Sequence, residues 1–268
     1  MSANPQTHRR TQRRFRNVAI VLAALVAVIA VPLMVMSQQR LELGYRLGIV
    51  PGGGSDVQQV AGPNDGAILV VVPFRAPGDA YGSAYRQRAQ YLARPSEAGM
   101  TLEDLSGGAS IAIPLQDLDF IAASDDGSII LFREGTAPSS ARSVVVDVTT
   151  GKVTDLPAGT LAPDLPGDWT TPVWAKVGTQ CGMRSVTSIY IACFPNPTLA
   201  TYLFGDWQLD LQLYGDYQIS RPLFRGLGFV PSLGWTNDDQ TIWFQNERGI
   251  WKIALGPNPL DLPSTPAP

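Results

Sequence analysis

The sequence contains a single histidine, His8, which lies among the first ten residues. Because the rest of the chain has no imidazole, Ser-His-Asp and Cys-His nucleophilic catalysis and histidine-based zinc sites are excluded there. Neither a G-x-x-x-x-G-K-[ST] nor a G-x-G-x-x-G fingerprint follows, so nucleotide chemistry has no support. We therefore expect no cofactor and no resident metal, and we expect the protein not to be an enzyme.

Charge is missing from one long stretch, Val18 to Met36, which is built almost entirely of Val, Ala, Ile, Leu and Met. A run of this length can cross the hydrocarbon core as a helix, and Pro32 in its last third is tolerated there. We predict a transmembrane helix over residues 17–37, with residues 18–36 in the lipid bilayer. The flanking arginines set its orientation, because an excess of basic residues marks the cytoplasmic side. Five of them precede the helix and only Arg40 closely follows it: Arg9, Arg10, Arg13, Arg14 and Arg16.

The alternative is a cleaved signal peptide, with Val28 and Ala30 preceding the cleavage site. The apolar stretch continues past Ala30, which favours a retained anchor in the cell membrane. In the anchored protein residues 1–16 form a basic cytoplasmic tail. With either interpretation the main domain lies outside the cytoplasm, in a periplasmic or extracellular space. Beyond residue 36 there are 15 basic and 23 acidic residues, a net charge of −8. We exclude nucleic acid as a partner, because phosphate contacts need a concentrated basic face.

Cysteine is scarce as well, with Cys181 and Cys193 as the two in the chain. Both lie in the exported part, where an oxidising compartment favours a disulfide. A loop of this size would stabilise the fold by about 3 kcal/mol in the chain-entropy model. A metal-ligand or nucleophilic role would lack a partner histidine, so we predict a structural disulfide.

Helical periodicity is scarce after the anchor, and an internal repeat takes its place. Glycine and proline make up 48 of the 268 residues and separate short runs rich in Val, Ile, Leu and aromatic residues, which predicts an all-β domain. Four of these runs resemble one another, and from their starts at about residues 65, 126, 186 and 239 they are 61, 60 and 53 residues apart. A period of this size is typical of a propeller blade with long loops, and flanking strands bring each unit to as many as four strands. The copies are Asn64 to Val71, Asp125 to Phe132, Val186 to Ile191 and Asp238 to Phe244.

Two segments resemble the WD40-like propeller repeat of the TolB type. The first runs from Trp235 to Phe244 and continues with Gly249 to Ile253; the second runs from Val145 to Gly151 and ends in Thr-Gly. The resemblance implies a small β-propeller-like domain of about four repeated blade units over residues 57–262, followed by a disordered tail over 263–268. An incomplete or distorted ring and a β-sandwich are the alternatives.

Closure of a propeller normally requires the two chain ends to share a blade. Residues 38–56 comprise a juxtamembrane strand and a Gly-rich linker, and residues 41–49 alternate apolar with polar or glycine positions. We predict that segment 41–49 completes the last unit, which is one strand short.

Aspartate is frequent at the turns. The clusters are Asp117, Asp119, Asp125 and Asp126, and Asp238, Asp239 and Glu247. Paired acids can hydrolyse glycosides or bind calcium, but hairpin turns favour aspartate in any case, so we predict a structural role.

One segment interrupts the repeat, an insertion from Arg75 to Glu97 in the first unit. Arginine and tyrosine dominate binding energy at interfaces, so this insertion is the candidate partner contact, with a solvated loop or a short helical turn as the alternative. The candidate residues are Arg75, Tyr81, Tyr85, Arg86, Arg88, Tyr91 and Arg94.

These features together favour a non-catalytic function. The predicted protein is a membrane-anchored extracytoplasmic interaction or scaffold module, and an accessory subunit of a membrane or envelope complex with protein partners at the membrane. The competing hypothesis is a carbohydrate-binding protein or a carboxylate-dependent glycan-active enzyme with its site at the propeller mouth.

Overall fold

The computed structural model describes part of the chain after the predicted anchor. The described residues are 56–73, 86–135, 142–157, 169–170, 183–187, 189–193, 206–214, 216–227, 232–246, 248–256 and 259–260. The basic tail, the predicted transmembrane helix over 17–37 and segment 41–49 lie outside them. Within the described residues, no helix is both long and apolar enough to cross a membrane.

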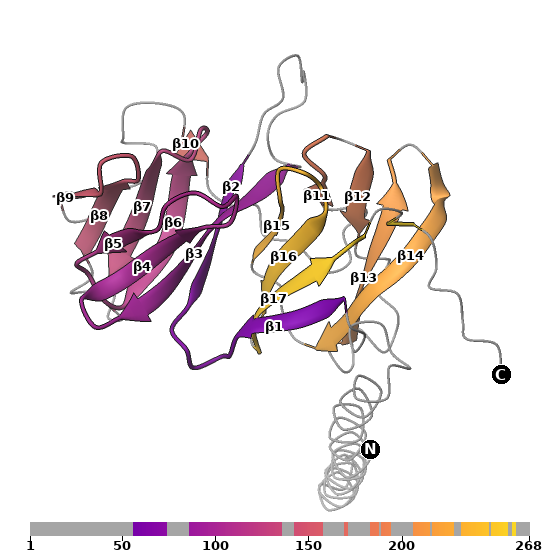
Figure 1. Ribbon diagram of the computed structural model, residues 1–268, viewed down its shortest axis with the longest axis horizontal. Coiled ribbons are helices and arrows are strands. Elements are labelled where there is room, and N and C mark those ends of the chain that lie inside the picture. Colours follow the sequence, from indigo (N-terminus) through magenta and orange to yellow (C-terminus); the bar gives the residue numbers. More distant parts are fainter. Residues whose placement is uncertain are drawn as a thin grey trace, which may run out of the picture.

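Every regular element among the described residues is a strand, so the all-β prediction is confirmed (Figure 1). The strands are β1 Val57–Ala61, β2 Ile68–Pro73, β3 Gln87–Ser96, β4 Gly99–Asp104, β5 Ile111–Ile113, β6 Leu118–Ser124, β7 Ile129–Glu134, β8 Arg142–Asp147, β9 Lys152–Asp155, β10 Trp169–Thr170, β11 Met183–Arg184, β12 Tyr190–Cys193, β13 Asp206–Leu213, β14 Asp216–Leu227, β15 Ser232–Trp235, β16 Thr241–Asn246 and β17 Gly249–Ala254.

The strands form four antiparallel units that succeed one another like propeller blades. Unit 1 contains β2 to β5, unit 2 contains β6 to β9, unit 3 contains β11 to β14, and unit 4 contains β15 to β17 together with β1. The short strand β10 pairs with β6 of unit 2, and a parallel pairing of Trp235 with Arg88 joins units 4 and 1 in one sheet. Figure 1 shows the order 2, 1, 4, 3 along the long axis, with units 2 and 3 at opposite ends of the row.

The strands β2, β7 and β16 carry uninterrupted apolar runs because both of their faces are covered. In β2, Val70 and Val72 contact the core shared by units 1 and 2, whereas Leu69 and Val71 contact the core shared by units 4 and 1. A third core joins units 3 and 4, and in it Phe224 meets Phe244 edge to face, with ring centroids 4.9 Å apart. Each fully buried side chain of this size contributes about 1.5–3 kcal/mol, so the packing between units is a major source of stability.

Unit 4 is completed by the first strand of the domain. β1 pairs antiparallel with β17, with Val57 opposite Ile253, and the side-chain Nε2 of Gln59 donates to the carbonyl of Arg248 at 2.6 Å. The two ends of the domain therefore do share a unit, but the prediction that segment 41–49 fills this position is wrong. Val57–Ala61 already occupies the edge of β17.

The first unit begins one strand later than the sequence repeat predicted, at β2 instead of β1. Asn64 to Gly66 resembles a hairpin turn, yet β1 before it pairs with β17 and β2 after it pairs with β3, so this segment connects two units. The described part of the predicted insertion is also regular structure. Residues 87–96 form β3, the second strand of unit 1, where the sequence suggested a loop or a helical turn.

In units 2 and 3, the hairpin between the first and second strands lies at the same end as the hairpin between the third and fourth. We call this end of the four units the turn face. It carries the β4–β5, β6–β7, β8–β9, β11–β12, β13–β14 and β15–β16 connections. The start of β1 lies there too, because the N–H of Ala254 at the end of β17 donates to the carbonyl of Asp56.

Candidate functional site

The β6–β7 hairpin of unit 2 is built on a serine and an aspartate two residues apart. The Oγ of Ser124 donates to Oδ1 of Asp126 at 2.7 Å and accepts from the N–H of Ile129 at 3.0 Å. The same Oδ1 accepts from the N–H of Ser128 at 2.9 Å. Gly127 takes the left-handed conformation, with φ at 72°. This turn satisfies its polar groups with its own side chains.

The β15–β16 hairpin of unit 4 repeats this arrangement. Its residues are shifted by one position from the repeat, which matches Asp125 with Asp238. The Oγ1 of Thr236 donates to Oδ1 of Asp238 at 2.6 Å and accepts from the N–H of Thr241 at 3.0 Å. Asp239, with φ at 56°, therefore stands where unit 2 has its glycine. The repeat in the sequence matches Gly127 with Gln240, whereas in the structure Gly127 corresponds to Asp239.

Unit 3 keeps the turn but has Thr187 where the other units have the aspartate. The Oγ of Ser185 accepts from the N–H of Tyr190 at 3.1 Å, as the matching hydroxyls do in units 2 and 4. The carboxylate is supplied by Asp239 of unit 4, which accepts from the N–H of Val186 at 2.7 Å, from the N–H of Thr187 at 3.1 Å and from the Thr187 hydroxyl. A 3 % exposed carboxylate thus links the turns of two units.

Turn hydrogen bonds also determine the acidity of these carboxyls. The hydroxyl of Ser124 and the N–H and hydroxyl of Ser128 lower the pKa of Asp126, and the hydroxyl of Thr236 with the N–H of Gln240 lowers that of Asp238. A carboxyl with a lowered pKa is ionised at neutral pH, so it is a poor proton donor. The predicted structural role of the turn aspartates is confirmed for these two.

A chain of polar contacts connects units 4, 1 and 2 across the turn face. The guanidinium of Arg88 on β3 donates to Oδ1 of Asn237 at 3.4 Å and to Oε1 of Gln90 at 2.7 Å. The Nε2 of Gln90 donates to Oη of Tyr91 at 2.9 Å, and that hydroxyl donates to the carbonyl of Gly127 at 3.3 Å. Three units are thereby held in register by residues of a single strand.

Burial shifts the pKa of two members of this chain. It lowers the pKa of Arg88, against the attraction of Tyr91, Asp104 and Asp126. Burial likewise raises the pKa of Tyr91, with the hydrogen bond from Gln90 acting in the opposite direction. Both side chains are therefore held in a partly dehydrated environment, where their hydrogen bonds are stronger than at an open surface.

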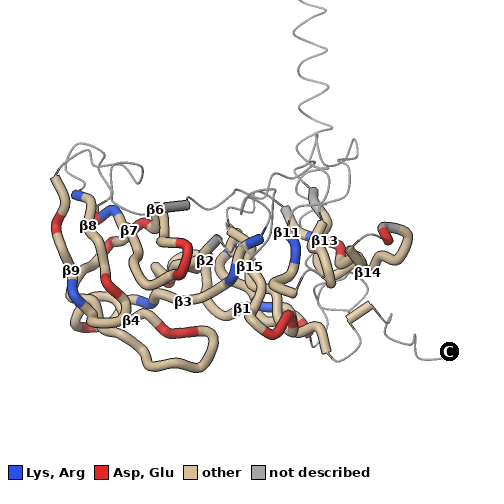
Figure 2. Tube along the Cα trace, turned by 90° about the horizontal axis from the view of Figure 1, so that it is seen from above, with Lys and Arg blue, Asp and Glu red and all other residues tan. Residues whose placement is uncertain are grey.

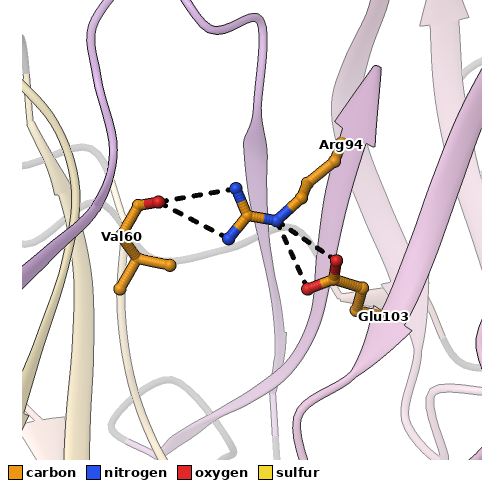
Figure 3. A network of polar contacts seen from close by, with 3 residues as sticks. All are labelled: Val60, Arg94 and Glu103. Atoms are coloured by element: carbon orange, nitrogen blue, oxygen red, sulfur yellow. Dashed lines mark hydrogen bonds and ion pairs between the residues drawn. The ribbon is translucent and has the colours of Figure 1, made fainter. Parts of the chain in front are cut away.

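Arg94 forms a second joint between units 1 and 4 (Figure 3). Its Nε pairs with the carboxylate of Glu103 on the neighbouring strand β4 at 3.2 Å, and its two Nη atoms donate to the carbonyl of Val60 on β1 at 3.4 and 3.5 Å. The guanidinium thus bridges a carboxylate of unit 1 and the backbone of unit 4.

A cleft of about 460 Å³ opens over the joint between units 1 and 4. Its lining includes two cations, one carboxylate, two amides and an indole: Arg88, Lys252, Asp238, Gln90, Asn237 and Trp243. Lys252 and Trp243 are cross-strand neighbours on β17 and β16. Among the described residues Lys252 takes part in no ion pair, whereas the Asp238 carboxylate already accepts two hydrogen bonds from its own turn. The cleft is therefore best suited to an acidic or hydrogen-bonding group.

A second cavity, of about 500 Å³, lies between units 1 and 2 near Asp117 and Asp119. The carboxylate of Asp119 pairs with Arg133 at 2.7 Å, and Gly99 in its wall lies close against the backbone of Leu115. Charged residues of both signs are spread over the described strands (Figure 2), and within the described part of the chain no cluster of acids, cysteines and histidines could hold a metal ion. The cleft between units 1 and 4 is the stronger candidate.

The structure places the predicted contact residues in different environments. Arg75, Tyr81 and Tyr85 lie outside the described residues. Arg86 and Tyr91 are buried, and Arg88 and Arg94 are held in the joints between units. Of the four that are described, only Arg88 lines the cleft. Three further lining residues, Lys252, Asn237 and Trp243, come from the fourth repeat and were not singled out as contact residues from the sequence.

The predicted disulfide stays a prediction, because Cys181 lies outside the described residues. Cys193 is buried at the end of β12, and its Sγ lies 3.4 Å from Oε1 of Gln212 on β13. The arginines of the N-terminal flank, Arg9 to Arg16, also lie outside the described part.

No protein-family model and no curated protein matches the sequence. Among solved structures, the chain is similar to a TolB structure from Agrobacterium tumefaciens, with 11% identity, a TM-score of 0.23, and coverage of 63% of this chain and 56% of that one. It is also similar to the tricorn protease (12% identity, TM-score 0.24, 71% and 20% coverage) and to the β-propeller domain of Cps50 (Swd1) from Myceliophteria thermophila (15% identity, TM-score 0.19, 63% and 51% coverage). The match thus spans about half of the TolB structure and a fifth of the tricorn protease. The propeller-like units are defined by the strand pairing of the described residues.

Proposed function

We propose that this protein is a membrane-tethered extracytoplasmic interaction module that acts as an accessory subunit of a membrane or envelope complex. The cleft between units 1 and 4 receives an acidic side chain of the partner. The tether and the compartment follow from the charge-free run over residues 18–36 and its arginine flank.

The cleft is the observation that carries this proposal. It presents the ammonium of Lys252 and the guanidinium of Arg88 beside the indole of Trp243, and the hydrogen bonds of Arg88 to Gln90 and Asn237 fix the guanidinium in place. Preorganised arginine and aromatic side chains are the residue types that dominate binding energy at interfaces. The carboxylate of a partner would pair with Lys252, at the open side of the joint.

The competing hypothesis of a glycan-active enzyme is less well supported by the same geometry. Such enzymes need one carboxylic acid that stays protonated near neutral pH, and its pKa is therefore raised. Asp238, which lines the cleft, and Asp126 in the neighbouring turn of unit 2 have lowered pKa values instead. A glycan could still bind in the cleft, and the experiment below separates that outcome from a protein partner.

Purification of the full-length protein from mildly solubilised membranes tests the proposal. We expect a defined partner to copurify, and Lys252→Glu to reduce its recovery at least fivefold by quantitative mass spectrometry. Lys152→Glu is the matched control, because Lys152 is an exposed strand lysine of unit 2 remote from the cleft, and it should leave recovery unchanged. Recovery of the wild-type chain as a lone monomer, or equal losses in both variants, would contradict the proposal. Binding of a glycan to the monomer that is abolished only by Lys252→Glu would favour the alternative.

A further inference from the structure

Three large hydrophobic side chains of the described residues are markedly exposed, and all belong to unit 3. Ile189 is 50% exposed, Tyr214 38% and Ile219 44%. Ile189 precedes β12, Tyr214 follows β13 and Ile219 lies near the start of β14, so antiparallel pairing brings them to one end of the sheet. The N–H of Tyr214 donates to the carbonyl of Ile189 at 2.8 Å, which fixes two of them side by side.

An arginine completes the group. The guanidinium of Arg184, at the end of β11, lies 4.0 Å from the ring centroid of Tyr214. We call these four residues the unit 3 patch: Arg184, Ile189, Tyr214 and Ile219. Tyrosine, arginine and aliphatic side chains together match the boundary between lipid headgroups and acyl chains, where aromatic rings settle and arginines extend to the phosphates.

The patch lies at the turn face, which is the end at which the chain enters the domain from the predicted anchor. Asp56 comes directly before β1, and its carboxylate pairs with Arg221 of β14 at 3.4 Å, two residues after Ile219. Residues 38–55 separate the predicted membrane span from this point. Eighteen residues reach at most about 60 Å when extended, so the tether allows the patch, which lies at the point of chain entry, to reach the bilayer.

From this placement we propose that the unit 3 patch rests on the surface of the bilayer that holds the chain's own anchor. The inference depends on the tether of the proposed function but not on the cleft or its partner. A few half-exposed side chains bind a free membrane weakly, but a tether raises their effective concentration at the surface to the millimolar range. Contact of unit 3 with lipid would fix the tilt of the row of units, with units 1 and 2 extending away from the anchor side.

The test uses the full-length chain reconstituted in vesicles that contain nitroxide-labelled lipid. A fluorescent amino acid replaces either Gln218, an exposed residue beside Ile219, or Thr154, an exposed residue of β9 in unit 2. We expect at least threefold stronger quenching at position 218 than at 154. The double substitution Ile189→Ser and Ile219→Ser should lower quenching at 218 to the level at 154.

Retention of the chain after alkaline carbonate extraction is measured on the same vesicles. A retained chain with equal quenching at the two positions overturns the lipid contact and leaves the tether intact. A chain that is extracted overturns the tether and this inference together. Shielding of position 218 in native membranes but not in pure lipid vesicles would assign the patch to a protein and would also overturn the inference.

Discussion

The β6–β7 turn of unit 2 and the β11–β12 turn of unit 3 share one backbone plan but differ in the source of their carboxylate. In unit 2, Asp126 satisfies the turn from within. In unit 3, Thr187 stands at that position, and Asp239 of unit 4 supplies both carboxylate oxygens from outside. The first turn is an independent local structure, whereas the second is complete only when two units are docked.

This difference teaches that a departure from the repeat can itself form a joint. Asp239 occupies the position of Gly127 and adopts a positive φ, which an L-residue with a side chain rarely does. The strain is compensated because the side chain reaches Val186 and Thr187 across the unit boundary. Unit 4 has Asp239 in place of the glycine, and unit 3 has Thr187 in place of the aspartate. These two departures from the repeat together form one contact between the units.

Substitution of Asp239 should have the largest effect on stability, because Asp239 provides the contact that distinguishes the turn of unit 3 from that of unit 2. Asp239→Ala removes three hydrogen bonds to unit 3 and the charge-assisted contact between two units, so we expect a loss of about 3 kcal/mol in the free energy of unfolding. Asp239→Asn tolerates the same φ and keeps one oxygen, and it should lose about half as much. Urea unfolding of the full-length chain in detergent, followed by tryptophan fluorescence, measures both. Equal stability of Asp239→Ala and wild type would show that the joint contributes nothing.

Gly127→Ala should come next, with a loss of about 2 kcal/mol. The left-handed backbone strains any Cβ, and a Cβ at this position would lie 2.3 Å from Oε1 of Gln90 in the polar chain between units. Gly107→Ala is the matched control, since φ is 90° there and nothing lies within 4 Å of its Cβ. The control should lose about 1 kcal/mol, and identical losses in the two variants would mean that the contact with Gln90 is unimportant.

The central strands of the units could be predicted from the sequence because burial on both faces leaves an uninterrupted apolar run. Ile129 to Phe132 and Ile242 to Phe244 are such runs, and both form strands where the repeat places them. The phase of the first unit could not be predicted. No feature of the sequence around β1 identifies β17 as its partner. Asn64 to Gly66 also has the composition of a hairpin turn, although it connects two units.

The candidate site was even less accessible from the sequence. Arg88 was singled out for its residue type, but Asn237 and Lys252, which share the cleft with it, are some 150 positions away. Tyr91 and Arg94 were singled out for the same reason and lie in the interior or in a joint. Residue type predicts the capacity to bind, whereas exposure depends on neighbours that only the folded chain brings together.

Tyr91→Phe tests how the turn of unit 2 is connected to unit 1. The variant keeps the buried ring and removes the hydroxyl that connects Gln90 with the carbonyl of Gly127, so we expect a loss of about 1 kcal/mol. In combination with Gly127→Ala the two losses should fall short of their sum, because both variants disrupt the same contact. Strict additivity in urea unfolding would contradict the connection between units 1 and 2.

The smallest effects on stability are expected from changes in pH. Their signs are opposite for Asp126 in unit 2 and Asp210 in unit 3. Turn hydrogen bonds lower the pKa of Asp126 in the fold, so its stabilisation is present above the unfolded value of about 3.9 and is lost as the pH falls through the folded pKa. Burial raises the pKa of Asp210 on β13, against hydrogen bonds from Gln208 and Ser220, so its ionised form destabilises the fold at neutral pH and protonation relieves this on acidification.

Accordingly, Asp126→Asn should lower stability by less than about 1 kcal/mol at pH 7 and flatten the acid limb of the stability curve. Asp210→Asn should raise the melting temperature slightly at pH 7 and have little effect near pH 4. Thermal unfolding between pH 3.5 and 8 measures both variants. Parallel pH profiles for the two would contradict the difference between these turn and strand carboxyls.

The strand that completes unit 4 has a consequence for biosynthesis. β1 emerges from the ribosome first, yet the carbonyl that accepts from Gln59 lies 189 positions further along the chain. Until then its apolar side chains and strand edge have no partner, so they are open to wrong pairing and to binding by chaperones. Closure over so long a separation is slow by its nature. We therefore expect translation that stops before residue 254 to leave unit 4 incomplete and β1 without its partner strand, which makes this single pairing a checkpoint for the whole domain.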